Sequence, residues 1–142
     1  MSSESTCVFC AIVAGKLPSH TVWAGDGVRV IMDAFPACDG HVLVIPDAHV
    51  ETLYELDDAL MRVVASAVRR AAIALRTVLD PDGLTVTQAN GEAAGQTVPH
   101  YHVHLMPRTS GERLRMHGTG PGDPERLAAL ARQLADAMPA AH

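Results

Sequence analysis

Three histidines alternate along the stretch GQTVPHYHVHLMPR, residues 95–108. Successive side chains of a β-strand point to opposite faces, so His100, His102 and His104 are predicted to share one face of a strand over residues 100–106. A core position for three titratable rings would require three sets of hydrogen-bond partners. The spacing therefore favours a functional site on this strand over a purely structural role.

The chemistry of such a strand has two interpretations. Alternating histidines can chelate a metal ion, because imidazole nitrogens are common Zn²⁺ ligands. Alternatively, the central ring of His102 attacks phosphorus while its neighbours bind phosphate oxygens. The preceding loop, NGEAAGQTV at residues 90–98, supplies glycines, backbone N–H groups and the Thr97 hydroxyl. These groups suit an oxyanion such as phosphate, which favours the second interpretation.

The segments around this strand predict an α+β fold. Short segments rich in β-branched residues predict about five strands in an antiparallel sheet, at residues 21–24, 28–32, 41–45, 84–89 and 100–106. Helical apolar spacing predicts a short helix over 8–14, a long helix over 57–79 and a C-terminal helix over about 123–138. The arginines of the long helix are predicted to lie largely away from its apolar face: Arg62, Arg69, Arg70 and Arg76.

Length and composition limit the classes of protein that the chain can represent. With 142 residues, a mass of 15.0 kDa and 48% hydrophobic residues, a single domain over 1–142 is expected. A formal charge of -5 leaves no excess of positive charge for a phosphate backbone, so nucleic-acid binding is not expected. The early apolar run at 7–15 is too short to span a bilayer and has no basic residue before it. A cytoplasmic protein without membrane insertion is therefore expected.

The cysteines suggest a second site near the N-terminus. The chain has three cysteines, and two of them form the motif Cys7-Val8-Phe9-Cys10. This spacing is typical of half of a zinc site, and it also occurs in buried thiol pairs and redox pairs. A closed tetrahedral zinc site needs two further ligands.

Three stretches together resemble the histidine triad (HIT) family. Residues 95–108 are similar to its His-φ-His-φ-His-φ-φ signature, where φ is apolar, and GHVLVIPDAH at 40–49 resembles a second landmark. Residues 7–19, CVFCAIVAGKLPS, resemble the opening of the bacterial, Hint-like members. The resemblance covers about 7–108, which is expected to be the core of the domain, with the predicted C-terminal helix as an extension.

The resemblance implies a nucleotide-binding homodimer with the HIT-like fold that cleaves purine nucleotide conjugates (of AMP or GMP) at the α-phosphate, without a catalytic metal. By position, His102 is the nucleophile that forms a nucleotidyl-histidine intermediate, and the backbone carbonyl of His100 orients its ring. The implied catalytic set is His100, His102, His104 and Thr97. The implied nucleotide-binding set is Asp33, His41, Asn90, Gln96, Thr97, Val98, His102 and His104. The bacterial resemblance also implies a structural zinc ion on Cys7, Cys10, His49 and His100.

Several substrates and reactions are compatible with the sequence. A nucleoside phosphoramidase is the favoured activity, and a dinucleoside polyphosphate hydrolase is the nearest enzymatic alternative. A zinc-stabilised nucleotide-binding or scaffold protein with little turnover is an alternative of another class. A metal-dependent hydrolase with its ion on His100, His102 and His104 is a third. The histidine at position 104, where the nucleotidyl-transferase branch has glutamine, favours hydrolysis over transfer.

Overall fold

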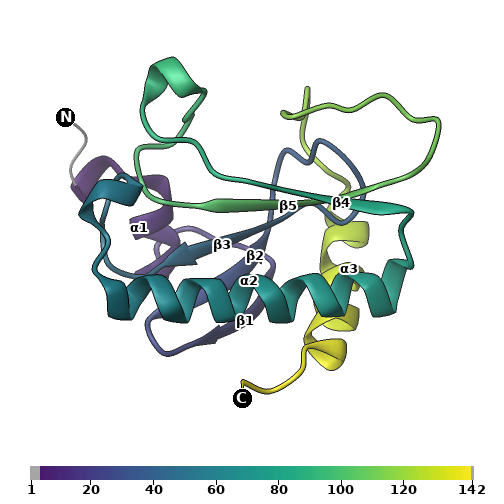
Figure 1. The fold of residues 1–142 in the computed structure, drawn as a ribbon, viewed down its shortest axis with the longest axis horizontal. Helices are drawn as coiled ribbons and strands as arrows, with labels where there is room; N and C mark the ends of the chain where they lie inside the picture. The colour runs from purple at the N-terminus through teal and green to yellow at the C-terminus, as the bar shows by residue number, and fades with distance from the viewer. Residues whose placement is uncertain (1–3, 142) are drawn as a thin grey trace.

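The computed structural model describes residues 4–141, so the ends of the predicted 1–142 domain lie outside the described residues. Its strands are β1 (Thr21–Gly25), β2 (Val28–Met32), β3 (Val42–Pro46), β4 (Gly83–Thr87) and β5 (Val103–Arg108). Its α-helices are α1 (Val8–Val13), α2 (Asp58–Leu79) and α3 (Pro124–Ala137) (Figure 1). The short 3-10 helices are η1 (Glu4–Thr6), η2 (Leu53–Glu55) and η3 (Glu92–Ala94). The predicted α+β fold, with a five-stranded antiparallel sheet, a long helix and a C-terminal helix, is confirmed.

The sheet places the end of the chain's histidine stretch between two other strands. The strand order is β1-β2-β3-β5-β4, and each neighbouring pair is antiparallel. In this register His104 lies opposite Leu43 of β3 on one side and Thr87 of β4 on the other. The backbone of His104 is therefore fixed by both neighbours, while β1 and β4 form the edges of the sheet.

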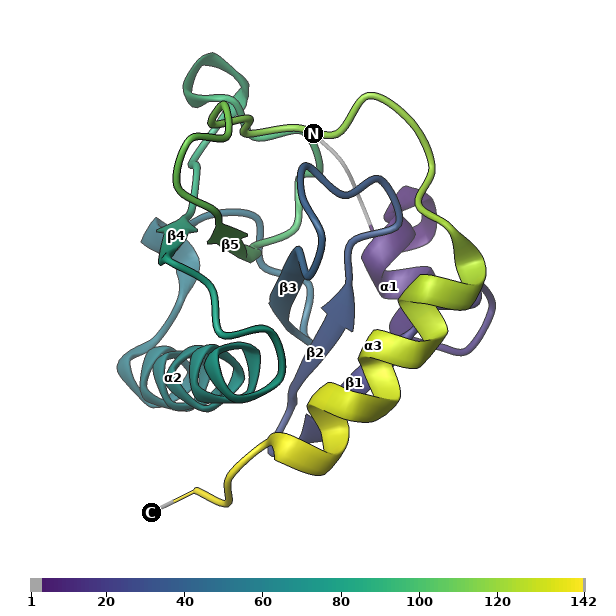
Figure 2. The ribbon, with the colours of Figure 1, turned by 90° about the vertical axis from the view of Figure 1, so that its right-hand side faces the viewer.

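Helices α2 and α3 pack against one face of the sheet. Figure 2 views α2 nearly end-on, with α3 crossing the β1 and β2 side. The main core joins strand residues such as Val30, Val44 and Leu105 to Leu75 of α2 and Leu130 of α3. Burial of these apolar side chains supplies most of the stabilisation, at about 25 cal/mol per Å² of buried apolar surface. The apolar stripes predicted for both helices thus face the sheet.

The ends of α2 follow the chemistry of its sequence. Asp57 caps the N-terminus, because its side chain accepts a hydrogen bond from the Leu60 N–H at 2.7 Å. Asp80 ends the helix in a left-handed conformation with φ of 45°, and Pro81 follows. Within residues 4–141, no helix has the length and apolar character needed to cross a bilayer.

The opposite face of the sheet carries α1 and a second apolar cluster. Phe9 packs there against Ile31 of β2 and against Leu43 and Ile45 of β3. These strand residues alternate with Val30, Val42 and Val44 of the main core, as the two-residue period of a strand requires. The second cluster therefore holds the Cys7–Cys10 segment against β2 and β3, and β3 pairs with β5, the strand that contains His104.

The predicted strand over 100–106 is corrected, because β5 begins only at Val103. The Tyr101 N–H donates to the Val50 carbonyl at 2.7 Å, and the His100 N–H donates to the Val98 carbonyl at 2.8 Å. The backbone before Val103 is therefore bonded to loops instead of to β3. The predicted strands at 41–45 and 84–89 are also shifted, to Val42–Pro46 and Gly83–Thr87.

One arginine of α2 is buried, although the helical spacing predicted the arginines of this helix to lie largely away from the apolar face. Arg70 is only 4% exposed, and its guanidinium carbon lies 4.3 Å from the centre of the Trp23 ring. Its Nε also donates to the Ser66 hydroxyl at 3.4 Å. A cation stacked on an aromatic face with a hydrogen-bonded head is a stable buried arrangement, which the helical spacing alone does not reveal.

Candidate active site and metal centre

The ring of His102 is held by the backbone carbonyl of the residue two positions before it. Nδ1 of His102 lies 2.7 Å from the His100 carbonyl oxygen. A carbonyl only accepts, so Nδ1 must carry the proton and Nε2 keeps its lone pair. The side chain is 5% exposed, and burial lowers its pKa below the usual 6.5 even though the carbonyl bond opposes this shift. His102 therefore presents a neutral ring with an unprotonated Nε2.

His104 lies beside His102 on the same side of the sheet. Their ring centroids are 4.8 Å apart. Nδ1 of His104 lies 2.9 Å from Nε2 of His41, which is almost fully buried directly before β3. Gly40, directly before His41, has a φ of 84° and packs so closely against α2 that a Cβ there would lie 2.5 Å from Leu79 Cδ1. The structure thus brings His41, His102 and His104 together.

Asp33 joins this group from the end of β2. One carboxylate oxygen accepts the Phe35 N–H at 2.8 Å, and the other lies 3.4 Å from Nε2 of His41. Burial raises the pKa of this carboxyl, against the smaller opposing effect of the Phe35 hydrogen bond. Asp33 therefore shapes the turn that precedes His41 and leads into the site.

The loop at 90–98 is closed by the side chain of Gln96. Its amide oxygen accepts the Gly91 N–H at 2.7 Å, while its nitrogen donates to the carbonyls of Glu51 and Val98. Asn90 is similarly engaged, since its oxygen accepts the Leu53 N–H at 2.7 Å. The amides of Gln96 and Asn90 thus hold the loop in shape.

The same loop also carries an exposed hydroxyl group, that of Thr97, which can donate a hydrogen bond to a ligand. Thr97 has no hydrogen-bond partner among residues 4–141, and it lies three positions before His100. Figure 1 shows that this loop and the 109–122 segment both rise above the sheet at the top of the view. Of the loop residues predicted for nucleotide binding, Thr97 is therefore the one with an unengaged polar side chain.

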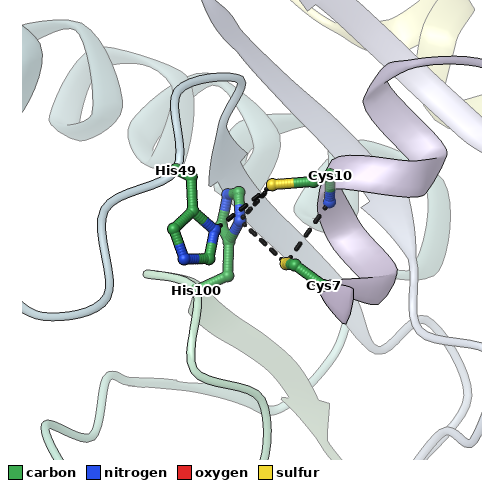
Figure 3. Close-up of side chains that lie close together, drawn as sticks. All are labelled: Cys7, Cys10, His49 and His100. Atoms are coloured by element: carbon green, nitrogen blue, oxygen red, sulfur yellow. Dashed lines mark hydrogen bonds between the residues drawn. The ribbon is translucent and has the colours of Figure 1, made fainter. Parts of the chain in front are cut away.

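A second cluster forms between α1, the loop after β3 and the segment before β5. Figure 3 shows Cys7, Cys10, His49 and His100 pointing toward one another. Nδ1 of His100 lies 3.3 Å from Cys7 Sγ and 3.6 Å from Cys10 Sγ, and Nδ1 of His49 lies 3.2 Å from Cys10 Sγ. All four ligand atoms lie within 4.8 Å of one another. The four residues predicted to form a zinc site are thus brought together.

The donor set of this cluster fits a tetrahedral zinc ion. With Zn–S bonds of about 2.3 Å and Zn–N bonds of about 2.1 Å, a tetrahedral site has S···N separations of about 3.6 Å, close to the observed 3.2–3.6 Å. Nε2 of His100 lies 2.8 Å from the Pro46 carbonyl and must donate to it, so Nδ1 faces the thiols with its lone pair. Nε2 of His49 is buried without a hydrogen-bond partner in the described chain and lies 3.9 Å from a Glu51 carboxylate oxygen.

The expectation of one patch of three imidazoles is wrong for His100. Its ring belongs to the cysteine cluster, whereas the rings of His102 and His104 remain together. Phe9, which the sequence did not single out, lies between the two sites. Its ring makes edge contacts with His100 and His102 at centroid distances of 5.6 and 5.3 Å. Its place inside the Cys7–Cys10 motif was the only signal available.

With this geometry established, the comparisons with known proteins identify the class. Residues 14–111 match the model of the HIT domain. Since these residues make up more than half of the chain, the chain belongs to the histidine triad family. It is 42% identical to Protein hit of Bacillus subtilis over 108 residues, which cover 76% of this chain and 74% of that protein. It is 32% identical to the adenylylsulfatase HINT3 of Arabidopsis thaliana over 120 residues, covering 80% of this chain and 61% of that protein.

Solved structures of the family superpose closely. A Hit-like protein from Bartonella henselae, solved with an unknown ligand, gives a TM-score of 0.89 at 31% identity and covers 96% of this chain and 99% of that one. A hypothetical histidine triad nucleotide-binding protein from Sulfolobus tokodaii gives a TM-score of 0.85 at 26% identity and covers 93% of this chain and 91% of that one. A Zn-bound histidine triad protein from Mycobacterium smegmatis gives 0.83 at 34% identity, with 96% and 95% coverage.

Proposed function

We propose that this protein is a nucleotidyl hydrolase that cleaves at the α-phosphate of purine nucleoside phosphoramidates or related nucleotidyl conjugates. The observation that carries the proposal is the 2.7 Å contact between His102 Nδ1 and the His100 carbonyl. Because that contact places the proton on Nδ1, Nε2 of His102 is the unprotonated nitrogen that attacks phosphorus. Nucleotide binding is further supported by the fold shared with a protein of Sulfolobus tokodaii described as a hypothetical histidine triad nucleotide-binding protein.

The reaction has two displacements. First, Nε2 of His102 forms a bond to the α-phosphorus while the bond from phosphorus to the leaving group breaks and its electron pair stays on the leaving group. An amine leaving group takes a proton from solvent or from a bound water as it departs. Water then attacks the phosphorus of the nucleotidyl-histidine and loses a proton to solvent, the P–N bond breaks with its electron pair returning to Nε2, and the nucleoside monophosphate is released. Donors from His104 and Thr97 stabilise the charge on the phosphate oxygens in both steps.

The rest of the nucleotide is proposed to extend from His102 toward the end of β2 and the 90–98 loop. Asp33 offers a carboxylate at that end for the ribose hydroxyls, beside His41. Asn90, Gln96 and Val98 shape the loop that carries Thr97 to the phosphate side. The adenylylsulfatase relative supports an adenylyl conjugate as substrate, and dinucleoside polyphosphates are the second candidate class.

A structural zinc ion is proposed on Cys7, Cys10, His49 and His100. When bound, the ion would supply a cross-link between α1 and the segment that ends in the triad, with two thiolates balancing its charge. The fit of the donor atoms and the Zn-bound relative from Mycobacterium smegmatis support this assignment. Catalysis itself is proposed to need no metal, because the nucleophile is the imidazole of His102.

A homodimer is proposed through the exposed edge of the sheet. β4 is an edge strand, and it leaves Leu84 and Val86 37% and 47% exposed. An open edge with apolar side chains is a favourable surface for pairing with a second copy.

Turnover of defined substrates tests the proposed function. We expect release of AMP from adenosine 5'-phosphoramidate, with comparisons on adenylyl sulfate and diadenosine polyphosphates ranking the leaving groups. A preference for diadenosine polyphosphates would establish the second candidate class. Reversible AMP binding without turnover of any of these would instead establish a binding protein, and activity abolished by a chelator and restored by added metal would establish a metal-dependent hydrolase.

A further inference from the structure

The two nitrogens of His41 have different partners, and these partners fix where its proton lies. The Ala37 backbone N–H donates to Nδ1 of His41 at 2.9 Å. A backbone N–H is only a donor, so Nδ1 must be unprotonated and the neutral ring must carry its proton on Nε2. The ring is 1% exposed, so neither nitrogen faces bulk solvent.

The proton on His41 fixes the tautomer of the next ring. Nε2 of His41 lies 2.9 Å from Nδ1 of His104, so the N–H of His41 donates and Nδ1 of His104 accepts. The neutral His104 ring therefore carries its proton on Nε2. That nitrogen has no protein partner among the described residues.

The neighbouring rings of His102 and His104 thus have opposite tautomers. His102 is protonated on Nδ1 and offers a lone pair at Nε2, because the His100 carbonyl accepts its proton. His104 is protonated on Nε2 and offers an N–H, because the chain from Ala37 through His41 leaves it no other arrangement. Their ring centroids are 4.8 Å apart, so the lone pair and the N–H belong to directly neighbouring rings.

We propose that His41 is a positioning residue, which holds His104 in the tautomer that donates an N–H to the phosphate or the leaving group. This proposal rests on the proposed nucleotidyl hydrolase function and adds a role for His41 that needs no contact with the substrate. The opposite tautomer of His104 would place two N–H groups against each other and would turn a lone pair toward anionic oxygen. The backbone of Ala37 therefore sets the chemistry of a side chain two hydrogen bonds away.

The proton on Nε2 of His41 also argues against a metal site formed by Asp33, His41 and His104. Asp33, His41 and His104 each offer a ligand atom within 4.8 Å of one another, a spacing that suits a metal ion. A metal on Nε2 of His41 would displace its proton to Nδ1, where the Ala37 N–H already points. Two N–H groups would then oppose each other in a buried position, which costs the hydrogen bond and the desolvation of both groups. The cluster is a hydrogen-bond chain.

Two variants of His41 separate this role from simple structural support. In His41→Asn, the amide oxygen can replace Nδ1 and accept the Ala37 N–H, but no donor reaches His104. In His41→Gln, the amide nitrogen can replace Nε2 and donate to His104, while the Ala37 bond is lost. We expect His41→Gln to lose at most about tenfold in kcat, and His41→Asn to lose on the order of a hundredfold, as for the loss of one oxyanion donor.

The stability of the two variants should follow the opposite order, since only His41→Gln leaves the part-buried Ala37 N–H without its acceptor. A purely structural role predicts that activity follows stability, so kcat for His41→Asn equal to or above that for His41→Gln would overturn the proposal. Nitrogen-15 NMR of the substrate-free protein gives a direct check. We expect His104 protonated on Nε2 in the wild type and in His41→Gln, and a mixture of tautomers in His41→Asn.

A wild-type His104 protonated on Nδ1 would overturn the inference even if the enzyme turns over nucleotides as proposed. Conversely, the expected tautomer in a protein that hydrolyses no nucleotide would leave the hydrogen-bond chain intact and contradict the proposed function. The two failures are therefore distinguishable.

Discussion

The backbone carbonyl of His100 and the side chain of His102 are joined by a 2.7 Å hydrogen bond, while the ring of His100 faces two cysteines. His100 therefore takes part in both clusters: its ring belongs to the candidate metal centre and its carbonyl orients the candidate nucleophile. Phe9 reinforces the link, because its ring contacts both histidines. Changes at the metal centre are expected to reach the nucleophile through this residue.

Replacing both cysteines of the motif by serine should remove the metal. The protein purified without added metal is expected to hold about one zinc per chain, and Cys7→Ser/Cys10→Ser to hold none, because serine does not supply a thiolate ligand. Cys38→Ser is the matched control, since Cys38 lies outside the cluster. Elemental analysis measures this directly. Wild-type protein with intact thiols and no zinc would contradict the assignment.

Activity of the double cysteine variant should fall without disappearing. The ion is not expected to contact substrate, but its loss frees the His100 ring and loosens the carbonyl that orients His102. Melting temperature and kcat measured on the same samples should decrease together. Unchanged kcat in a zinc-free protein would show that the two sites are independent.

The histidine pair beside the nucleophile should make stability depend on pH. Burial, with the neighbouring His104 charge second, lowers the pKa of His41 to about 3, and burial lowers the pKa of His104 to about 4. Both values lie below the unfolded value near 6.5, so the unfolded chain binds more protons below that pH. Stability is then fully present above about pH 6.5 and decreases as pH falls toward 4, by up to about 2 kcal/mol per ring at pH 5.

Urea unfolding at pH 7 and pH 5 measures this effect. His104→Gln should show a smaller loss of unfolding free energy between the two pH values than the wild type, because one of the two suppressed protonations is gone. The zinc ligands are the same in both proteins, so their own protonation cancels in the comparison. Equal losses in both proteins would show that His104 does not have its pKa lowered by folding.

The edge of the sheet should be the site of self-association. Sedimentation at micromolar concentration is expected to give about twice the chain mass of 15.0 kDa. Val86→Lys should shift the protein to monomer, because a charge on an edge strand opposes pairing. Leu17→Lys, which changes a similarly exposed residue outside the sheet, should leave the dimer intact. A monomeric wild type would refute the dimer.

The oxyanion donors should contribute less than the nucleophile. Thr97→Ala and His104→Ala are each expected to lower kcat by on the order of a hundredfold, the effect of removing one donor to a developing negative charge. Thr97→Ser should retain most of the activity, because it keeps the hydroxyl. Steady-state kinetics with adenosine 5'-phosphoramidate distinguish these variants. A Thr97→Ala enzyme with wild-type kcat would remove that hydroxyl from the reaction.

The sequence predicted the secondary-structure elements better than it predicted the long-range contacts between them. Two-residue and helical spacing predicted the sheet and its helices because those periods come from backbone geometry. The start of β5 was missed because the Tyr101 N–H bonds to Val50, a long-range contact with no local signal. Buried Arg70 was missed for the same reason, since its partner Trp23 lies far away in sequence.

The candidate site was likewise predicted only in part from the sequence. The four metal-cluster residues were predicted by the family resemblance, and the structure places them together. The sequence did not show that the His100 ring turns away from His102 and His104, because alternation fixes a face only within a regular strand. The role of Ala37 was also invisible, since a backbone N–H has no sequence signature.

The most direct test of the account is the mass spectrum of the protein after a rapid quench during turnover of adenosine 5'-phosphoramidate. A nucleotidyl adduct is expected on His102, acid-labile as a P–N bond should be, and His102→Ala should lack the adduct and turn over roughly a thousandfold more slowly or worse. An adduct on any other residue, or near-normal turnover by His102→Ala, would contradict the proposed mechanism.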